Sequence, residues 1–188
     1  PMVITQDLTV ALDANGDATV FAEMVDNGSS DDCEIVSISL NQTQFDCSDL
    51  GNVSVTLTVT DAGGNSSSAT ATITVLDLFD PIITCPDDMV SNFCNAPIDF
   101  PMPTAEDACG GVALTQIQGI PSGAVFPMGV TNIAFSAIDL SGNESNCSFT
   151  ITVENDLSIS TETTDNCFGA TSGMAIANVT GGNMPYNY

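Results

Sequence analysis

The feature that most constrains this chain is a duplicated pattern of alternating strands. Residues 53–59 and 131–137 each alternate apolar with mostly small polar side chains, then reach an Asp and a Gly-Asn turn. A second alternating segment follows in each copy, at 69–75 and 147–153. A period of two residues is typical of half-buried antiparallel strands, and no segment shows sustained helical periodicity. The duplication predicts an all-β chain built from units of about 80 residues.

The two copies predict tandem Ig-like β-sandwich repeats in a linear array. The first repeat takes residues 1–77 and the second repeat takes residues 78–155. Residues 156–188 begin a third module that is cut short and cannot bury a core alone. The linker between the repeats has no Gly or Ser run and contains Phe79. We therefore expect a semi-rigid rod, and the alternative is a freely hinged pair with Phe79 exposed.

The charge of the chain excludes several classes of partner. Lys, Arg and His are absent and Asp and Glu number 24, so the net charge is −24. Nothing in the chain can neutralise a phosphate or sulfate, which excludes nucleic acid, heparin-like polyanions and anionic membrane surfaces as direct partners. The 43% of hydrophobic residues distinguishes the chain from acidic disordered segments. Cations are the natural counterpart of its surface.

The seven cysteines predict an oxidising compartment, because their spacings do not fit a zinc site. No apolar run is long enough to span a membrane, so we expect no direct membrane insertion. The chain begins at Pro1 without a signal peptide, which predicts an internal segment of a longer precursor. The expected location is secreted, extracellular and at the cell surface.

Catalysis is not expected. A Ser or Cys nucleophile needs a base, normally His or Lys, and neither is present. An Arg or Lys clamp for an oxyanion or a phosphate is also absent. Only a carboxylate pair of the glycosidase type remains, and the acidic residues lie in predicted turns. We predict a chain that is not an enzyme and that requires no cofactor.

Comparison of the two repeats predicts one disulfide. Cys85 and Cys147 of the second repeat correspond to Thr5 and Ala69 of the first. Both cysteines are present in one copy and both are absent from the other, as expected for a bonded pair. In an Ig topology the first and last strands run parallel, so the beginnings of both lie at one end. We therefore predict the disulfide Cys85–Cys147.

The other cysteines are assigned within their own repeats. Cys33 and Cys109 correspond to each other, but the first repeat offers only Cys47 as a partner and the second offers only Cys94. This predicts the disulfides Cys33–Cys47 and Cys94–Cys109. Cys167 is expected to pair beyond residue 188 or with a neighbouring chain.

Residues 81–153 resemble a hyalin-repeat (HYR) domain over the whole repeat. The similar residues are Ile83-Thr-Cys85-Pro86, the segments 105–110, 122–129 and 137–143, and the final strand 147–153. Residues 1–77 are similar to a sister repeat of giant surface proteins of Bacteroidota, through the segments 12–16, 26–30, 45–47 and 58–61. The tail resembles the repeat of gliding-motility adhesins of that phylum, through 167–169 and 181–188. The resemblance implies an Ig-like fold, a secreted adhesin or filament, export by the type IX system and no catalytic residues.

The leading functional hypothesis is a structural and adhesive stalk whose repeats set length, stiffness and display. Its partners would be neighbouring repeats of the same protein and other copies in a fibre, with an adhesion target that the sequence leaves open. One alternative is a carbohydrate-binding module, but aromatic residues are only 6% and Trp is absent. Tyr186 and Tyr188 would supply its aromatic platform, whereas packing of both into the rest of the third repeat is the favoured interpretation. Another is a spacer attached to an extracellular hydrolase. The full-length precursor would discriminate between them.

Calcium is the one metal that the sequence suggests. Calcium prefers six to eight oxygen ligands, and Asp13-Ala-Asn15-Gly-Asp17 places acceptors at alternate positions around a Gly turn. Ig topology is expected to bring this hairpin near two acidic loops of the second repeat. The candidate ligands are Asp13, Asn15, Asp17, Asp77, Asp80, Asp107 and Asp139. The alternative is that Asp and Asn occupy these positions because they form good turns.

Overall fold

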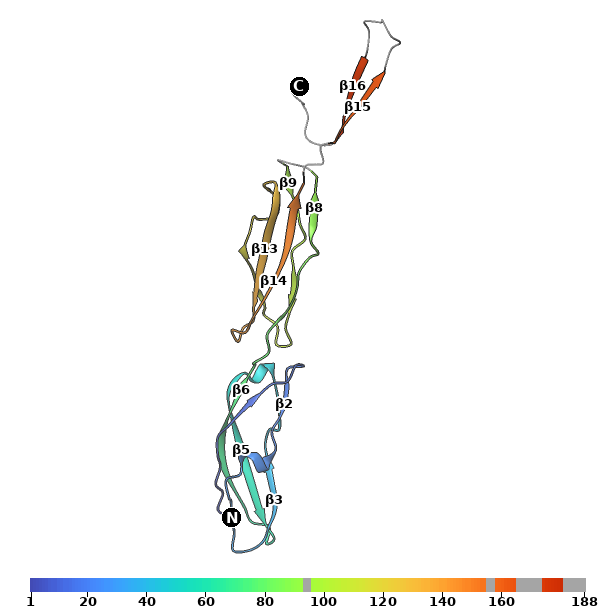
Figure 1. The fold of residues 1–188 in the computed structure, drawn as a ribbon. Coiled ribbons are helices and arrows are strands. Elements are labelled where there is room, and N and C mark those ends of the chain that lie inside the picture. The colour runs from blue at the N-terminus through green and yellow to red at the C-terminus, as the bar shows by residue number, and fades with distance from the viewer. Residues whose placement is uncertain (93–95, 155–157, 165–173, 181–188) are drawn as a thin grey trace, which may run out of the picture. The chain divides into compact units, whose positions relative to one another are not determined.

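The computed structural model describes residues 1–92, 96–154, 158–164 and 174–180 (Figure 1). Apart from the short helix α1 (Ala22–Val25) and the 3-10 turn η1 (Cys47–Asp49), every element in these ranges is a strand. Contacts divide the chain into two compact units. The first unit contains Pro1–Ile82, Ala105–Ala113 and Ala137–Ser145, and the second contains Ile83–Thr104, Leu114–Ser136 and the chain from Asn146. The predicted all-β class is confirmed.

The first repeat is a two-layer sandwich. Its strands are β1 (Leu8–Ala11), β2 (Asp17–Thr19), β3 (Ile35–Leu40), β4 (Gln44–Asp46), β5 (Gly51–Asp61) and β6 (Ser66–Leu76). One sheet has the order β1-β6-β5-β3, and β2 pairs with β4 in a second, smaller sheet. Strands β5 and β6 form a long antiparallel hairpin, and β1 runs parallel to β6.

The alternating pattern explains which face of the large sheet is buried. In β5, Val55, Leu57 and Val59 have no exposed surface, while the intervening Thr residues are partly exposed. Their apolar face packs with the equivalent face of β6 and with Phe45 of β4. Burying a side chain of this size contributes roughly 1.5–3 kcal/mol. The alternate apolar residues that the sequence pattern places on one face therefore form the sandwich core.

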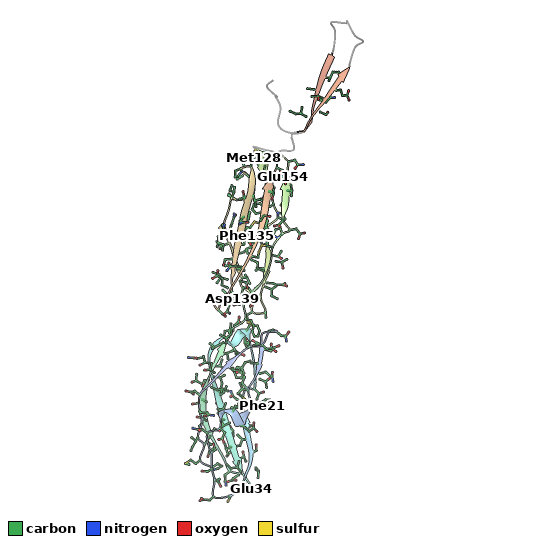
Figure 2. All side chains as sticks on the ribbon, viewed as in Figure 1. Phe21, Glu34, Met128, Phe135, Asp139 and Glu154 are labelled. Atoms are coloured by element: carbon green, nitrogen blue, oxygen red, sulfur yellow. A yellow bond between two sulfur atoms is a disulfide. The ribbon has the colours of Figure 1, made fainter. Side chains whose placement is uncertain are left out.

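The second repeat has the same plan. Its strands are β7 (Ile82–Thr84), β8 (Met89–Ser91), β9 (Pro97–Ile98), β10 (Thr104–Glu106), β11 (Ala113–Gln118), β12 (Ala124–Val125), β13 (Gly129–Ile138) and β14 (Glu144–Val153). The main sheet has the order β11-β13-β14-β8, with pairs β12-β9 and β10-β7 beside it. Its core contains four phenylalanines, including Phe135 (Figure 2).

Matching details confirm that the two repeats are structural copies. The early strand runs parallel to the last strand in both, as β1 with β6 and as β8 with β14. In the first copy the Asp7 carboxylate accepts a hydrogen bond from the Thr72 amide at 2.7 Å. In the second copy the Asp88 carboxylate accepts from the Thr150 amide at 2.6 Å. The predicted Ig-like sandwich plan therefore occurs twice.

The segment after the second repeat contains an antiparallel pair, β15 (Ser158–Thr164) and β16 (Met174–Thr180). The predicted domain boundaries at 77/78 and 155/156 follow the duplication and stay predictions. Cys94, Cys167, Tyr186 and Tyr188 lie outside the described residues. Within the described ranges, no helix is long and apolar enough to cross a membrane.

Candidate functional site

The predicted disulfide Cys85–Cys147 is present. It joins the chain just before β8 to strand β14, with 5.8 Å between the two Cα atoms. In the first repeat the corresponding place is bridged by a hydrogen bond, which the Thr5 hydroxyl donates to the Thr70 carbonyl at 2.9 Å. The comparison of the repeats predicts the disulfide, and the structure adds that the first copy closes the corresponding position by a hydrogen bond.

The other predicted disulfides are wrong. Cys47 is bonded to Cys109, while Cys33 is exposed and has no disulfide partner in the part of the chain that the structure describes. Cys109 is therefore not available to Cys94. The bond joins the first repeat to the loop after β10 of the second, and both cysteines belong to the first compact unit.

The length of β5 explains why Cys33 cannot reach Cys47. Glu34, next to Cys33, accepts a hydrogen bond from the amide of Ala62 at the far end of β5, and it marks this end of the first sandwich in Figure 2. Cys47 precedes the near end of β5. A strand of 11 residues spans roughly 35 Å, whereas disulfide-bonded residues have Cα atoms within about 7 Å.

Gly16 is fitted against the Cys47–Cys109 bond. It is buried and has φ of +83°, a left-handed conformation that suits glycine. A Cβ atom at this position would lie 2.6 Å from Cys47 Sγ and 3.7 Å from Cys109 Sγ. The Asn15-Gly16 pair is thus a tight turn, as predicted, and also the place where the turn passes the disulfide. Sequence reasoning found the turn but not the second role.

The carboxylate of Asp139 is held inside its own turn. Its Oδ1 accepts hydrogen bonds from the amides of Ser141 at 2.8 Å and Asn143 at 2.9 Å. Its Oδ2 accepts from Nδ2 of Asn143 at 2.8 Å. The Asp-x-Ser-Gly-Asn pattern therefore forms a closed turn that buries the carboxylate to 7% exposure.

The same turn contacts Asp77, which is 8% exposed. Nδ2 of Asn143 donates to the Asp77 carbonyl at 3.2 Å, and the Ser141 hydroxyl donates to the Asp77 carboxylate at 3.4 Å. The other Asp77 carboxylate oxygen accepts from the Phe79 amide at 3.1 Å. All of these residues lie in the first compact unit. The turn of the second repeat is therefore tied to the end of β6 by polar contacts as well as by the disulfide.

Two of the buried carboxylates have lowered pKa values. Burial alone would raise the pKa of Asp139, but hydrogen bonds from the Asn143 side chain and from the turn amides outweigh it, and the pKa lies below its ordinary value. In the first repeat, hydrogen bonds from the side chain and amide of Asn65 lower the pKa of Asp61. Both carboxylates are held in the charged form by donors of their own turns.

We expect Asp139→Asn to reduce the dependence of stability on acid pH. A lowered pKa in the folded state contributes stability above the unfolded value of about 3.9, and this contribution is lost as pH falls through the lower folded pKa. Urea unfolding at about pH 7 and pH 3 should show a smaller loss for the variant than for the wild type. Asp87→Asn, which removes an exposed charge, is the control. An equal acid loss in wild type and Asp139→Asn would contradict this expectation.

The structure brings together only some of the predicted calcium ligands. Within the described ranges, one grouping of potential metal-binding side chains contains Asp77 and Asp107 with Cys109, all within 4.8 Å of one another. Cys109 is excluded as a ligand by its disulfide. Asp107 also accepts a hydrogen bond from the Cys109 amide at 2.8 Å.

The remaining calcium candidates serve their own turns or line a nearby pocket. Asp13 accepts from the amides of Asn15 at 2.8 Å and Asp17 at 3.2 Å, and these hydrogen bonds lower its pKa. Asp80 lies with Asp107 in a shallow pocket whose other lining residues are Ala14, Phe79, Ile82, Glu106 and Ala108. Turn chemistry alone therefore accounts for the Asp13 motif, and calcium binding stays a prediction.

If calcium binds at Asp77 and Asp107, it should raise the melting temperature of the chain in a saturable way. Calcium at 100 times its Kd would stabilise the folded state by about 2.7 kcal/mol. Calorimetry in chelator and in millimolar calcium, with sodium chloride at equal ionic strength as the reference, measures the shift. Asp107→Asn should reduce it. The same melting temperature in chelator and in calcium would show that calcium does not stabilise this chain.

Comparison with known proteins agrees with the resemblance of the second repeat. The HYR domain family matches residues 76–153. Hyalin of Strongylocentrotus purpuratus is 33% identical over 86 residues, which are 43% of this chain and 7% of hyalin. The chain thus spans a small part of the length of that curated relative.

The solved structures that a structural comparison matches to this chain include protocadherin extracellular domains. Human protocadherin-24 EC1-2 has a TM-score of 0.39 and 13% identity, covering 79% of this chain and 94% of that chain. The protocadherin γB4 extracellular domain has a TM-score of 0.44 and 14% identity, covering 97% of this chain and 38% of that one.

Proposed function

We propose that the chain is a non-catalytic structural and adhesive segment of a large secreted surface protein or extracellular filament. The observation that carries the proposal is the duplicated sandwich, one copy of which matches the HYR domain. A chain that repeats one fold, and whose turn carboxylates are engaged by their own backbone, is suited to spacing and display.

The disulfides support an extracellular location. Two are present among the described residues, and disulfides persist in oxidising compartments. They also stabilise small sandwiches with limited cores. The net charge of −24 with no Lys or Arg keeps such a chain soluble through mutual repulsion. Its partners are proposed to be neighbouring repeats of its own protein and other copies in a fibre.

We further propose that the parent protein is a surface adhesin of Bacteroidota exported by the type IX system and connected with gliding motility. The support is the resemblance of residues 1–77 and of the tail to repeats of such proteins. The tail motifs 167–169 and 181–188 fall outside the described residues.

Antibody labelling of source cells tests the location and the export route. An antibody raised against residues 1–188 should label intact cells, and a strain without a working type IX system should retain the protein inside. Labelling that appears only after permeabilisation of wild-type cells would overturn the proposal. Surface labelling that is unchanged without the type IX system would overturn the export route alone.

The stalk role predicts semi-rigid behaviour of the full chain in solution. Small-angle scattering should then give one narrow distribution of end-to-end distances for the two repeats. Cys47→Ser with Cys109→Ser should broaden this distribution, because it removes the covalent bond between the repeats. A broad distribution in the wild-type chain would contradict the stalk role and favour a hinged pair.

A further inference from the structure

Cys33 has the position of a cysteine that bonds to another repeat. It is exposed and has no disulfide partner in the part of the chain that the structure describes. A leftover thiol in a secreted protein suggests pairing outside its own module. The second copy of the fold indicates the partner, because its corresponding cysteine, Cys109, is bonded.

Cys33 and its counterpart Cys109 donate the same local hydrogen bond. The Asp31 carboxylate accepts a hydrogen bond from the Cys33 amide at 2.7 Å. The Asp107 carboxylate accepts from the Cys109 amide at 2.8 Å. Each cysteine therefore lies two residues after an Asp whose carboxylate accepts its amide hydrogen bond. In the second copy this cysteine is bonded to Cys47 of the first repeat.

The turns that accompany these cysteines are also copies. Asp61 accepts from the Asn65 amide at 2.8 Å and from Asn65 Nδ2 at 2.9 Å. Asp139 accepts from the Asn143 amide at 2.9 Å and from Asn143 Nδ2 at 2.8 Å. Backbone bonds close both turns, from Asp61 N to Asn65 O at 3.0 Å and from Asp139 N to Asn143 O at 3.1 Å.

In the second repeat, the end that carries this turn and Cys109 contacts the repeat before it. Asn143 donates to the carbonyl of Asp77, and Cys109 bonds to Cys47. Both partners, Asp77 and Cys47, come from the repeat that precedes it in the chain. The first repeat carries the same end, with Asn65 and Cys33, but Cys33 has no disulfide partner among the described residues.

We infer that Cys33 forms a disulfide with a β-sandwich repeat that carries a cysteine at the position of Cys47 and lies before the first repeat. The bond would repeat the Cys47–Cys109 connection one module earlier. The inference rests on the proposed tandem-repeat function only in supposing that another such repeat adjoins. It adds that successive repeats are joined covalently. The earlier repeat supplies a cysteine at the start of η1, and the later repeat supplies a cysteine after an Asp turn.

The bond forms by a balanced oxidation. The two thiols lose two protons and two electrons and form one sulfur–sulfur bond. A small-molecule disulfide such as oxidised glutathione accepts the electrons and protons, and its own sulfur–sulfur bond breaks to give two thiols. The exposure of Cys33 allows the exchange.

The test adds a second copy of residues 1–80 in front of the full chain, with refolding in a glutathione redox buffer. In the added copy Cys33→Ser removes its own thiol, and Ser48→Thr gives the peptide containing its Cys47 a distinct mass. The chain has no Lys or Arg, so endoproteinase Asp-N replaces trypsin; it cuts before Asp46 and separates Cys33 from Cys47. Non-reducing peptide mapping then reads the connections.

We expect a peptide that links Cys33 to the mass-labelled Cys47, with Cys47–Cys109 intact in the original chain. Alkylation of Cys33 in the folded protein should slow at least ~10-fold relative to the unextended chain. Cys47→Ser in the added copy should restore its reactivity. Reactive Cys33 in the extended protein, a link to Cys94 or Cys167, or a disulfide-linked dimer would each overturn the inference. None of these outcomes would alter surface labelling, which tests the proposed function separately.

Discussion

Replacing Cys47 and Cys109 together with serine is expected to lower the free energy of unfolding by about 4 kcal/mol. The bond closes a loop between residues 62 apart in sequence, so its loss frees a long segment in the unfolded chain. The cysteines are partly buried against the first core, and their Cα atoms are 5.2 Å apart, within the usual range. Urea unfolding monitored by circular dichroism measures the change.

The chain offers a matched control for this variant. Cys85 and Cys147 are also 62 residues apart, so the chain-entropy effect of removing their bond is the same. The two variants should differ in where the structure loosens. Hydrogen exchange of residues 105–113 and 137–145 should accelerate when Cys47 and Cys109 are replaced and should change less when Cys85 and Cys147 are replaced. Equal exchange of these segments in both variants would show that the bond does not hold them in the first compact unit.

Phe100→Ala is expected to cost about 3–5 kcal/mol of unfolding free energy. Phe100 is 6% exposed and lies in the core of the second repeat. Its ring meets three others edge to face, with centroids 6.4 Å from Phe126, 6.5 Å from Phe135 and 5.3 Å from Phe149. Such pairs contribute about 0.5–1.5 kcal/mol beyond the burial of their area. The Ala variant loses all three contacts and leaves a cavity.

An exposed phenylalanine provides the control for this prediction. Phe21 is 60% exposed, and Phe21→Ala should change the free energy of unfolding by no more than about 0.5 kcal/mol. Phe100→Leu, which restores part of the volume, should recover part of the loss. Chemical denaturation of the full chain gives all three values under one condition. If Phe100→Ala were as mild as Phe21→Ala, the aromatic cluster would not be the centre of the second core.

The two disulfides differ in whether the sequence alone predicts them. The pair Cys85 and Cys147 is predictable because both cysteines appear in one copy and neither appears in the other. The duplication also predicts the sandwich itself, since a period of two residues places alternate side chains on one face whatever the rest of the chain does. The turn Asp13–Asp17 is predictable for another local reason, because Asp, Asn and Gly favour turns.

The partner of Cys47 is decided only by the tertiary structure. Cys33 is nearer in sequence, but β5 holds the two cysteines at opposite ends of the first sandwich, and the strand is too long for a disulfide to bridge. Cys109 lies 62 residues away and yet belongs to the same compact unit. The meeting of Asp77 with Asn143 and the fit of Gly16 against the disulfide depend on the same juxtaposition. Sequence periodicity determined which face of each strand is buried, because alternation along a strand is local. Which loops come into contact depended on strand length and on the packing of turns from both repeats, and only the folded chain specifies these.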